Sequence, residues 1–185
     1  MSKLVITDYP IEPPACVEYD PRVAEVVREI TEMISAALPR VAVEHIGSTS
    51  VPGCAGKGII DLMVLYPDGL LEEAKEGLRR LGFQRQTVGH PMPESRPMKV
   101  GAVRYQGRLY RLHVHVIADH SPEVTALRRF RDRLRASRQA VERYVAQKRA
   151  ILAEGVTDCQ AYTAMKSSFI QKALASRASS SASRR

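Results

Sequence analysis

A glycine-serine turn and a buried aspartate are the first features of this sequence that could do chemistry. Gly47 and Ser48 follow a predicted strand over 41–46, so their backbone N–H groups would be free to hold a phosphate, although a Gly-Ser pair can also be an ordinary turn. Asp61 lies inside the apolar run 58–66, where an ionised carboxylate is unfavourable unless it has a partner. Asp61 could be a metal ligand or a general base, or it could bond a backbone N–H or an arginine for structural reasons.

Two histidines spaced two residues apart could complete such a site. His113 and His115 lie in an alternating segment, so as strand residues they would share one face while Val114 faces the core. Two imidazoles on one face can bind a metal, pair with a phosphate or orient a carboxylate. The pattern also fits two exposed histidines on a hairpin. The Gly-x-Ser-x-Gly elbow is absent, which argues against Ser48 as a hydrolase nucleophile.

Positive charge could neutralise a phosphate held at this site. The chain has 28 Lys and Arg against 20 Asp and Glu, a net charge of +8. The segment 127–149 is rich in arginine, which would attract phosphates, nucleic acid or an acidic partner, or would form a solvated helix face. Lys57 could neutralise a phosphate, although the P-loop spacing is absent. Lys148 and Lys166 could do the same from the C-terminal helices.

Hydrophobic periodicity and turn signals predict the elements that must position these residues. The predicted helices are 20–38, 70–81, one that begins after Ser121 with a break at 136–138, and a last one capped by Asp158. The predicted strands are a central strand at 58–66, with 41–46, an edge strand at 83–88, and a hairpin of 99–105 and 109–117. The proline-rich segment 1–20 is expected to be extended or irregular, and the loop 90–97 could act as a lid.

This order of elements predicts an α+β domain with a small mixed sheet backed by helices on one side. One domain is expected over 1–175, followed by a disordered basic tail at 176–185. No apolar run approaches the roughly 20 residues of a membrane span, and the N-terminus lacks a secretory pattern. The three scattered cysteines suit neither a disulfide framework nor a metal site, which favours the cytoplasm.

The stretch EHIGSTSVPGCAGKGIIDLMV, residues 44–64, resembles the signature of the GrpB family, EHIGST-x-VPG-x-x-x-K-x-I-ID. Further matches at YDPR (19–22), HVHV (113–116) and YVAQKRAIL (144–152) extend the resemblance over roughly residues 16–175. The family resembles the nucleotidyltransferase superfold related to polymerase β. In that superfold a Gly-Ser turn holds nucleotide phosphates, acidic residues on the next strand hold Mg²⁺, and a later strand supplies a third acid.

Two departures from this pattern bear on the activity. The second acid would stand two residues after Asp61, where this chain has Met63, and the later strand offers His113 or His115 in place of the third acid. Because Mg²⁺ prefers octahedral oxygen coordination, one aspartate with imidazoles is a poor site for it. The ordinary two-metal mechanism is therefore in doubt, although the fold is not.

The resemblance implies a nucleotidyltransferase-like enzyme that moves a nucleotidyl group from a nucleoside triphosphate to a small molecule or protein. The implied catalytic residues are Asp61, His113 and His115, with Asp61 and His115 as ligands of Mg²⁺ or Mn²⁺. The implied nucleotide-binding residues are Gly47, Ser48, Thr49, Lys57 and Lys166. The alternative is a non-catalytic module that binds a nucleotide or coenzyme. Nucleic-acid binding through the segment 128–149 is disfavoured, because aromatic residues for base stacking are not interleaved there.

Overall fold

The computed structural model describes residues 4–87, 92–156, 161–162 and 164–165. Its elements in chain order are α1 (Val23–Ala37), β1 (Ala42–Ile46), the short 3₁₀ helix η1 (Ser48–Ser50), β2 (Ile59–Tyr66), α2 (Leu71–Arg80), β3 (Gln84–Arg85), β4 (Met98–Tyr105), β5 (Arg108–Ala118), α3 (Pro122–Arg135) and α4 (Arg138–Ala153). No helix among these residues is long and apolar enough to cross a membrane.

The five strands form one mixed sheet in the order β1-β2-β5-β4-β3, which confirms the predicted sheet. The β2–β5 pair is parallel, and the other pairs are antiparallel. β2 is a central strand, and all of its residues except Asp61 are buried. The parallel register places Asp61 beside His113 and Met63 beside His115. Residues two apart on a strand point to the same side, so this register brings the three predicted catalytic residues to one face of the sheet.

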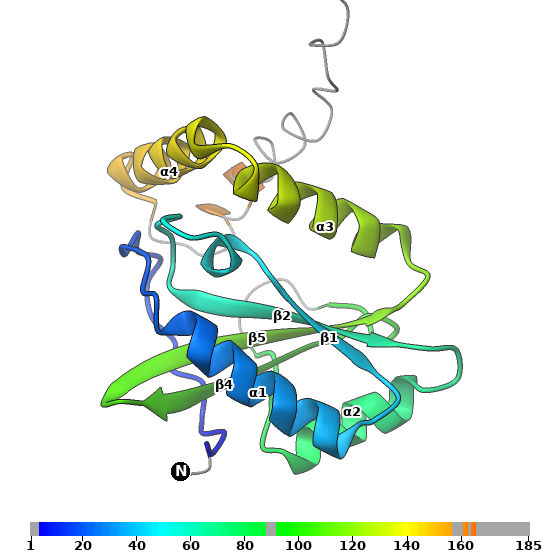
Figure 1. The fold of residues 1–185 in the computed structure, drawn as a ribbon. Helices are drawn as coiled ribbons and strands as arrows, with labels where there is room; N and C mark the ends of the chain where they lie inside the picture. Colours follow the sequence, from blue (N-terminus) through cyan, green and yellow to red (C-terminus); the bar gives the residue numbers. More distant parts are fainter. Residues whose placement is uncertain (1–3, 88–91, 157–160, 163, 166–185) are drawn as a thin grey trace, which may run out of the picture.

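Helices cover both faces of this sheet, so the expectation of helices on one side was wrong. α1 and α2 lie against one face (Figure 1), where Ile60 and Leu62 of β2 join the main core. α3 crosses the other face, where its Val124 packs with Met63 and Leu65. The physical reason is that β2 is apolar on both faces. Met63 and Leu65 point away from α1 and α2, so another helix must shield them from water.

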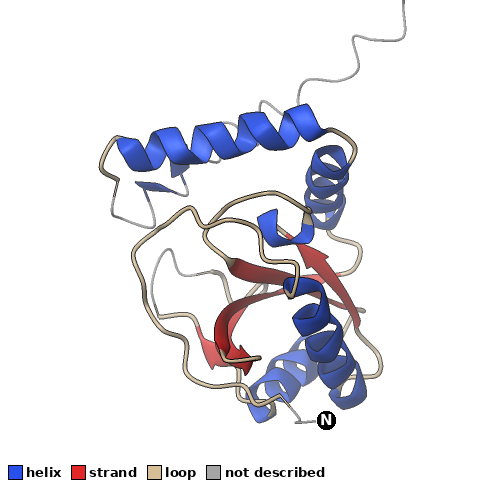
Figure 2. Cartoon of the chain, turned by 60° about the vertical axis from the view of Figure 1, so that its left-hand side comes forward, coloured by secondary structure: helices blue, strands red, loops and turns tan. Residues whose placement is uncertain are grey.

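The N-terminal segment 7–18, called the strap below, crosses the sheet before the chain enters α1 (Figure 2). At its start Thr7 exchanges two backbone hydrogen bonds with Ala102 of β4, at 2.8 and 3.0 Å. At its end Val17 exchanges two with Gly56, at 2.7 and 2.9 Å. Residues 4–20 contain no helix and only isolated bridges, as the proline-rich sequence predicted.

Helix boundaries follow the predicted caps with one difference. Ser121 caps α3 and Ser137 caps α4, which confirms the predicted break between these two helices. α1 begins at Val23, three residues after Asp20, although Asp20 Oδ1 accepts a hydrogen bond of 3.1 Å from the backbone N–H of Arg22, as a capping residue does. The predicted start of a last helix at Asp158, residues 88–91 around the predicted lid, and the tail at 176–185 lie outside the described residues.

Candidate functional site

The Gly47–Ser48 turn lies directly against Asp61. Gly47 has a φ of 71°, a left-handed conformation that glycine adopts readily, and a Cβ at this position would collide with Asp61 Oδ2. The next residues fold back on the turn, with Ser50 N donating to Gly47 O at 3.3 Å and Val51 N donating to Ser48 O at 3.1 Å. These bonds leave the N–H groups of Ser48 and Thr49 unused by η1 itself, as at any helix start.

A half-buried histidine, His45, contacts the turn through Thr49. His45 Nε2 lies 3.0 Å from Thr49 Oγ1, and that hydroxyl donates to Ile59 O at 3.1 Å. Burial lowers the pKa of His45 to about 4, so its imidazole is neutral near pH 7. Because the single Thr49 proton goes to Ile59, His45 must donate through Nε2. Thr49 can therefore offer a ligand its backbone N–H, while its hydroxyl holds the turn in place.

Asp61 is the centre of a cluster with the two predicted histidines. Its side chain is 26% exposed, and its Oδ1 lies 3.5 Å from His113 Nδ1 and 3.6 Å from His115 Nε2. Burial opposes ionisation, but the imidazoles of His113 and His115 beside the carboxylate outweigh it and hold the pKa of the Asp61 carboxyl well below its usual range. Asp61 is therefore ionised, and a carboxylate of such low pKa accepts a proton poorly near pH 7.

Arg96 fixes the proton of His115. Arg96 Nη1 lies 3.1 Å from His115 Nδ1, and a guanidinium can only donate, so Nδ1 accepts. Burial lowers the pKa of His115, which keeps the ring neutral with its proton on Nε2, facing Asp61. Arg96 is held in turn by Glu123 at the first turn of α3, with Nε 2.7 Å from Oε2. Sequence reasoning missed Arg96, which lies in the proline-rich loop before β4.

His113 has a partner on its other side that sequence reasoning also missed. Its Nε2 lies 2.9 Å from the hydroxyl of Tyr9 on the strap, and the two rings are 5.3 Å apart. His113 thus connects the Asp61 carboxylate to the Tyr9 hydroxyl through its two ring nitrogens. Tyr9 and His113 are separated by 104 positions in the sequence, so no local spacing could have indicated the contact.

The donor set does not fit a magnesium ion. Among the described residues no group of three or more His, Cys, Asp or Glu side chains is arranged to hold a metal. Met63 stands where a second acid was expected, and it is fully buried among apolar side chains. The His115 ring directs an N–H toward Asp61 and offers no lone pair there, and Mg²⁺ prefers oxygen ligands. The metal role predicted for Asp61 and His115 stays a prediction.

Lys148 is the cation that the structure brings to the turn. This α4 residue is 2% exposed, its Nζ donates to Ala55 O, and the same atom lies 4.3 Å from the centre of the Tyr144 ring. A Cβ on Gly56 would stand 2.6 Å from Ser48 Oγ and 3.1 Å from Lys148 Nζ, so the hydroxyl and the ammonium group meet at this glycine. Ser48 and Lys148 therefore both lie beside Gly56.

Lys57 and Lys166 were the other lysines predicted to bind phosphate. Lys57 Nζ lies 4.4 Å from the centre of the Tyr162 ring, a cation–π contact. The Lys57 carbonyl accepts a hydrogen bond of 3.0 Å from Arg111 of β5, on the same face as His113. Lys166 lies outside the described residues. The phosphate-binding roles of Lys57 and Lys166 stay predictions.

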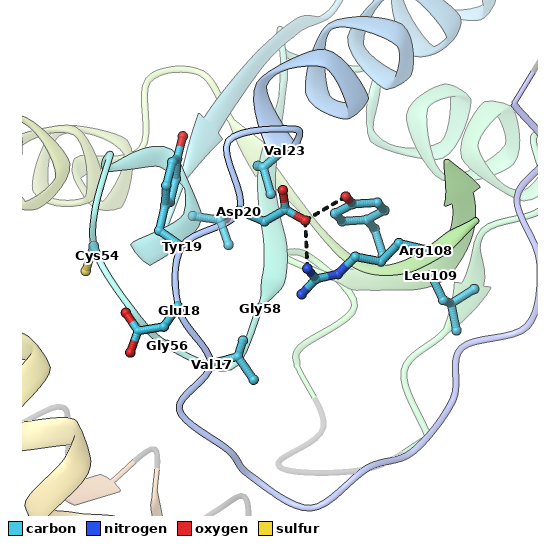
Figure 3. Close-up of a pocket in the computed structure, with 12 residues that line it drawn as sticks. Val17, Glu18, Tyr19, Asp20, Val23, Cys54, Gly56, Gly58, Arg108 and Leu109 are labelled. Carbon is cyan, nitrogen blue, oxygen red and sulfur yellow. Dashed lines mark hydrogen bonds and ion pairs between the residues drawn. The ribbon is translucent and has the colours of Figure 1, made fainter. Parts of the chain in front are cut away.

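Two hollows flank the turn. The smaller, about 30 Å³, lies between the end of the strap, residues 54–58 and the start of β5 (Figure 3). Asp20 closes it with bonds of 2.8 Å to Arg108 and 2.8 Å to Tyr110. The larger, about 900 Å³, lies between η1 and the helices α3 and α4, with Arg135 and Arg138 in its wall. Neither hollow is lined by the Asp61 cluster, but both reach Thr49 of the turn.

Taken together, the fold and the site define an α+β domain in which a Gly-Ser turn after one strand faces an aspartate on the next. The GrpB family model, described as GrpB protein, matches residues 13–176, and the chain therefore belongs to the GrpB family. It is 35% identical over 157 residues to the UPF0157 protein SCO7215 of Streptomyces coelicolor, which covers 83% of this chain and 78% of that protein.

A solved structure of a GrpB protein agrees with this family assignment. The crystal structure of conserved protein GrpB from Enterococcus faecalis superposes with a TM-score of 0.69 at 25% identity, over 86% of this chain and 94% of that chain. The Cid1 poly(U) polymerase bound to MgATP gives a TM-score of 0.48 at 13% identity, over 71% of this chain and 45% of that chain. A likeness that distant decides no activity, so the function is argued from the site.

Proposed function

We propose that this protein binds a nucleoside triphosphate at the Gly47–Thr49 turn and transfers its nucleotidyl group to an acceptor. One observation carries the proposal: the Ser48 hydroxyl and the Lys148 ammonium group meet at Gly56, while the same turn touches the Asp61 carboxylate through Gly47. A group that can bind anions and a cluster that can move protons therefore both lie against this one turn.

The turn supplies the phosphate contacts. The N–H groups of Ser48 and Thr49 and the Ser48 hydroxyl donate to phosphate oxygens, and Lys148 neutralises their charge from within the protein. A buried ammonium group interacts with an anion more strongly than an exposed one, because little water screens it. Lys148, at 2% exposure, is in this position.

His113 is the group that accepts the proton of the attacking acceptor. Its Nε2 faces the strap, away from Asp61, and its Nδ1 side lies against the Asp61 carboxylate. Asp61 orients the ring and stabilises the positive charge that forms on it, as the acid of a catalytic triad does. His115 is locked as a donor to Asp61 by Arg96, so it holds the carboxylate and moves no proton.

A second candidate function is binding of a nucleotide or coenzyme without catalysis. The observation that favours it is Met63, which is fully buried in the apolar cluster under α3 and leaves the superfold's second acid absent. The turn and Lys148 would hold phosphates in the same way. The two candidates differ only in whether pyrophosphate is released.

Nucleic-acid binding through the arginine-rich helices is not proposed. Arg128 and Arg131 of α3 both pair with Glu44 of β1, and Arg135 donates to Ser50 O at 2.8 Å. These side chains attach α3 to the sheet and to η1, so they are part of the scaffold. A cytoplasmic location and an unidentified acceptor remain predictions.

Isothermal calorimetry with ATP, CTP, GTP and UTP, each with Mg²⁺, with Mn²⁺ and with neither, tests the proposal together with a pyrophosphate-release assay. We expect binding of at least one nucleotide and pyrophosphate release that Asp61→Asn abolishes. Asp68→Asn is the control, because that aspartate side chain is 90% exposed and remote from the turn. Binding without release would favour the non-catalytic module. No binding of any of the four triphosphates under any condition would contradict the proposed transfer reaction.

A further inference from the structure

Tyr9, His113 and Asp61 are arranged like a nucleophile, its base and the acid that orients the base. Its hydroxyl lies 2.9 Å from His113 Nε2, and His113 Nδ1 lies 3.5 Å from Asp61 Oδ1. A hydroxyl, an imidazole and a carboxylate in that order are the parts by which proteins deprotonate a weak nucleophile: the base takes the proton and the acid orients the base. Tyrosine is among the side chains that form covalent intermediates in this way.

The strap holds Tyr9 in this position from both sides. Two backbone hydrogen bonds join Thr7 to Ala102 of β4, and the Tyr9 N–H donates to Gln84 Oε1 of β3 at 3.2 Å. Further along, Glu12 pairs with Arg111 of β5 at 3.2 Å. The tyrosine ring lies on the His113 ring, with 5.3 Å between their centres. The strap thus delivers a half-buried hydroxyl to the face that carries Asp61.

Other tyrosine hydroxyls in the described part of the chain have different partners. Tyr66 donates to the Ser95 carbonyl at 3.1 Å, Tyr105 bonds the Glu25 carboxylate, and Tyr110 bonds the Asp20 carboxylate at 2.8 Å. Burial, with the bond to Asp20, raises the pKa of Tyr110 to about 12. A hydroxyl bonded to a carboxylate is held protonated there, whereas Tyr9 faces a nitrogen that can take its proton away.

We propose that the Tyr9 hydroxyl is itself an acceptor of the nucleotidyl group, an inference that rests on the function proposed above. The Tyr9 oxygen attacks the α-phosphorus of the bound triphosphate, and a new Tyr O–P bond forms. The bond from that phosphorus to the oxygen bridging it to the β-phosphate breaks, and its electron pair leaves with pyrophosphate. The tyrosine proton moves to His113 Nε2. The product is a tyrosyl nucleotide, a phosphodiester on the strap.

The test is intact-mass spectrometry and peptide mapping of the full chain after incubation with each of the four triphosphates and Mn²⁺. We expect one nucleoside monophosphate to be added at Tyr9. Tyr9→Phe should remove the adduct while leaving nucleotide binding by calorimetry unchanged. His113→Gln keeps the tyrosine but lacks the base, so the rate of labelling should fall roughly 10²- to 10⁴-fold. Tyr19→Phe, on the same N-terminal segment, is the matched control and should be labelled like the wild type.

The outcomes separate this inference from the proposed function. Binding and pyrophosphate release with no adduct on Tyr9 would overturn the inference and leave the proposed function standing. An adduct that survives in Tyr9→Phe, on another residue, would overturn it as well. If calorimetry shows no binding of any triphosphate, the proposed function fails and the inference fails with it.

Discussion

Asp61 and Met63 lie two residues apart on the same face of β2, yet their surroundings are opposite. The Asp61 side chain is 26% exposed and meets the two imidazoles of β5 and the backbone of Gly47. Met63 is fully buried, and it packs in an apolar cluster that includes Ile46 of β1 and Val124 of α3. One face of the sheet therefore holds a polar site and a piece of core side by side.

The difference shows how the packing of a helix limits the number of acids in the site. α3 crosses the sheet over Met63, so a carboxylate at that position would lie beneath Val124 and Leu127 without water. The polar site and the apolar cluster meet at the first turn of α3. There Glu123 binds Arg96, and Arg96 in turn binds His115. In this chain the single-carboxylate site and the docking of α3 depend on each other.

The largest expected effect comes from placing a second carboxylate in the apolar cluster, at position 63. Met63→Asp would place a carboxylate in the cluster under α3, and we expect it to lower the free energy of unfolding by about 3–5 kcal/mol. Met63→Leu, which conserves volume and polarity, should lower it by less than about 1.5 kcal/mol. Urea unfolding followed by circular dichroism measures both. A Met63→Asp protein as stable as the wild type would show that the boundary is not set by α3.

A smaller effect on the free energy of unfolding is expected from changes at two glycines between β1 and β2. Gly47 and Gly53 both have positive φ, but a Cβ at Gly53 would meet nothing within 4 Å, whereas at Gly47 it collides with Asp61. Alanine at Gly53 should therefore lower the free energy of unfolding by about 1 kcal/mol, from backbone strain alone. Alanine at Gly47 should lower it by roughly 1–3 kcal/mol more, because Asp61 must shift. Equal losses of the free energy of unfolding in the two variants would mean that Gly47 does not pack against Asp61.

The smallest effect concerns the histidine behind the turn. The pKa of His45 is about 4 in the folded protein against 6.5 for an unperturbed histidine, so the unfolded chain binds more protons between these values. Stability should therefore fall as the pH falls through this window, by about 1–2 kcal/mol between pH 7 and pH 5. Asp61 opposes this shift, and Arg131 and Arg135 add to it.

Two variants isolate the contribution of His45. His45→Gln can still donate to Thr49 but cannot titrate, so its stability should depend less on pH in this window than that of the wild type. His120→Gln removes a histidine whose side chain is 65% exposed, and it should keep the wild-type dependence. Urea midpoints measured from pH 4 to pH 8 give both slopes. A wild-type slope in His45→Gln would refute a neutral His45 in the folded state.

Local sequence patterns predicted much of the Asp61 cluster and of the turn beside it. The two-residue period of a strand placed His113 and His115 on one face, and the strand-end position of Gly47 placed the turn beside Asp61, as the structure shows. The sheet type and the break between α3 and α4 were also predicted correctly, because each depends on local periodicity or on a capping residue.

The contacts that complete the site could not be predicted in this way. Tyr9 reaches His113 across 104 residues, and Arg96 reaches His115 from a loop without periodicity. The sequence suggested Lys148 as one of several cations, but its meeting with Ser48 depends on how α4 packs on the loop at Gly56. The apolar stripe of α3 predicted a helix, and the face of the sheet that it covers follows from tertiary packing alone.

A crystal structure with a non-hydrolysable triphosphate analogue tests the central claim most directly. The account predicts phosphate density against the N–H groups of Ser48 and Thr49, with the α-phosphate on the side of the turn that faces Asp61. A nucleotide whose phosphates do not contact the Ser48 and Thr49 N–H groups, for example one held only by Arg135 and Arg138 in the larger hollow, would contradict the account.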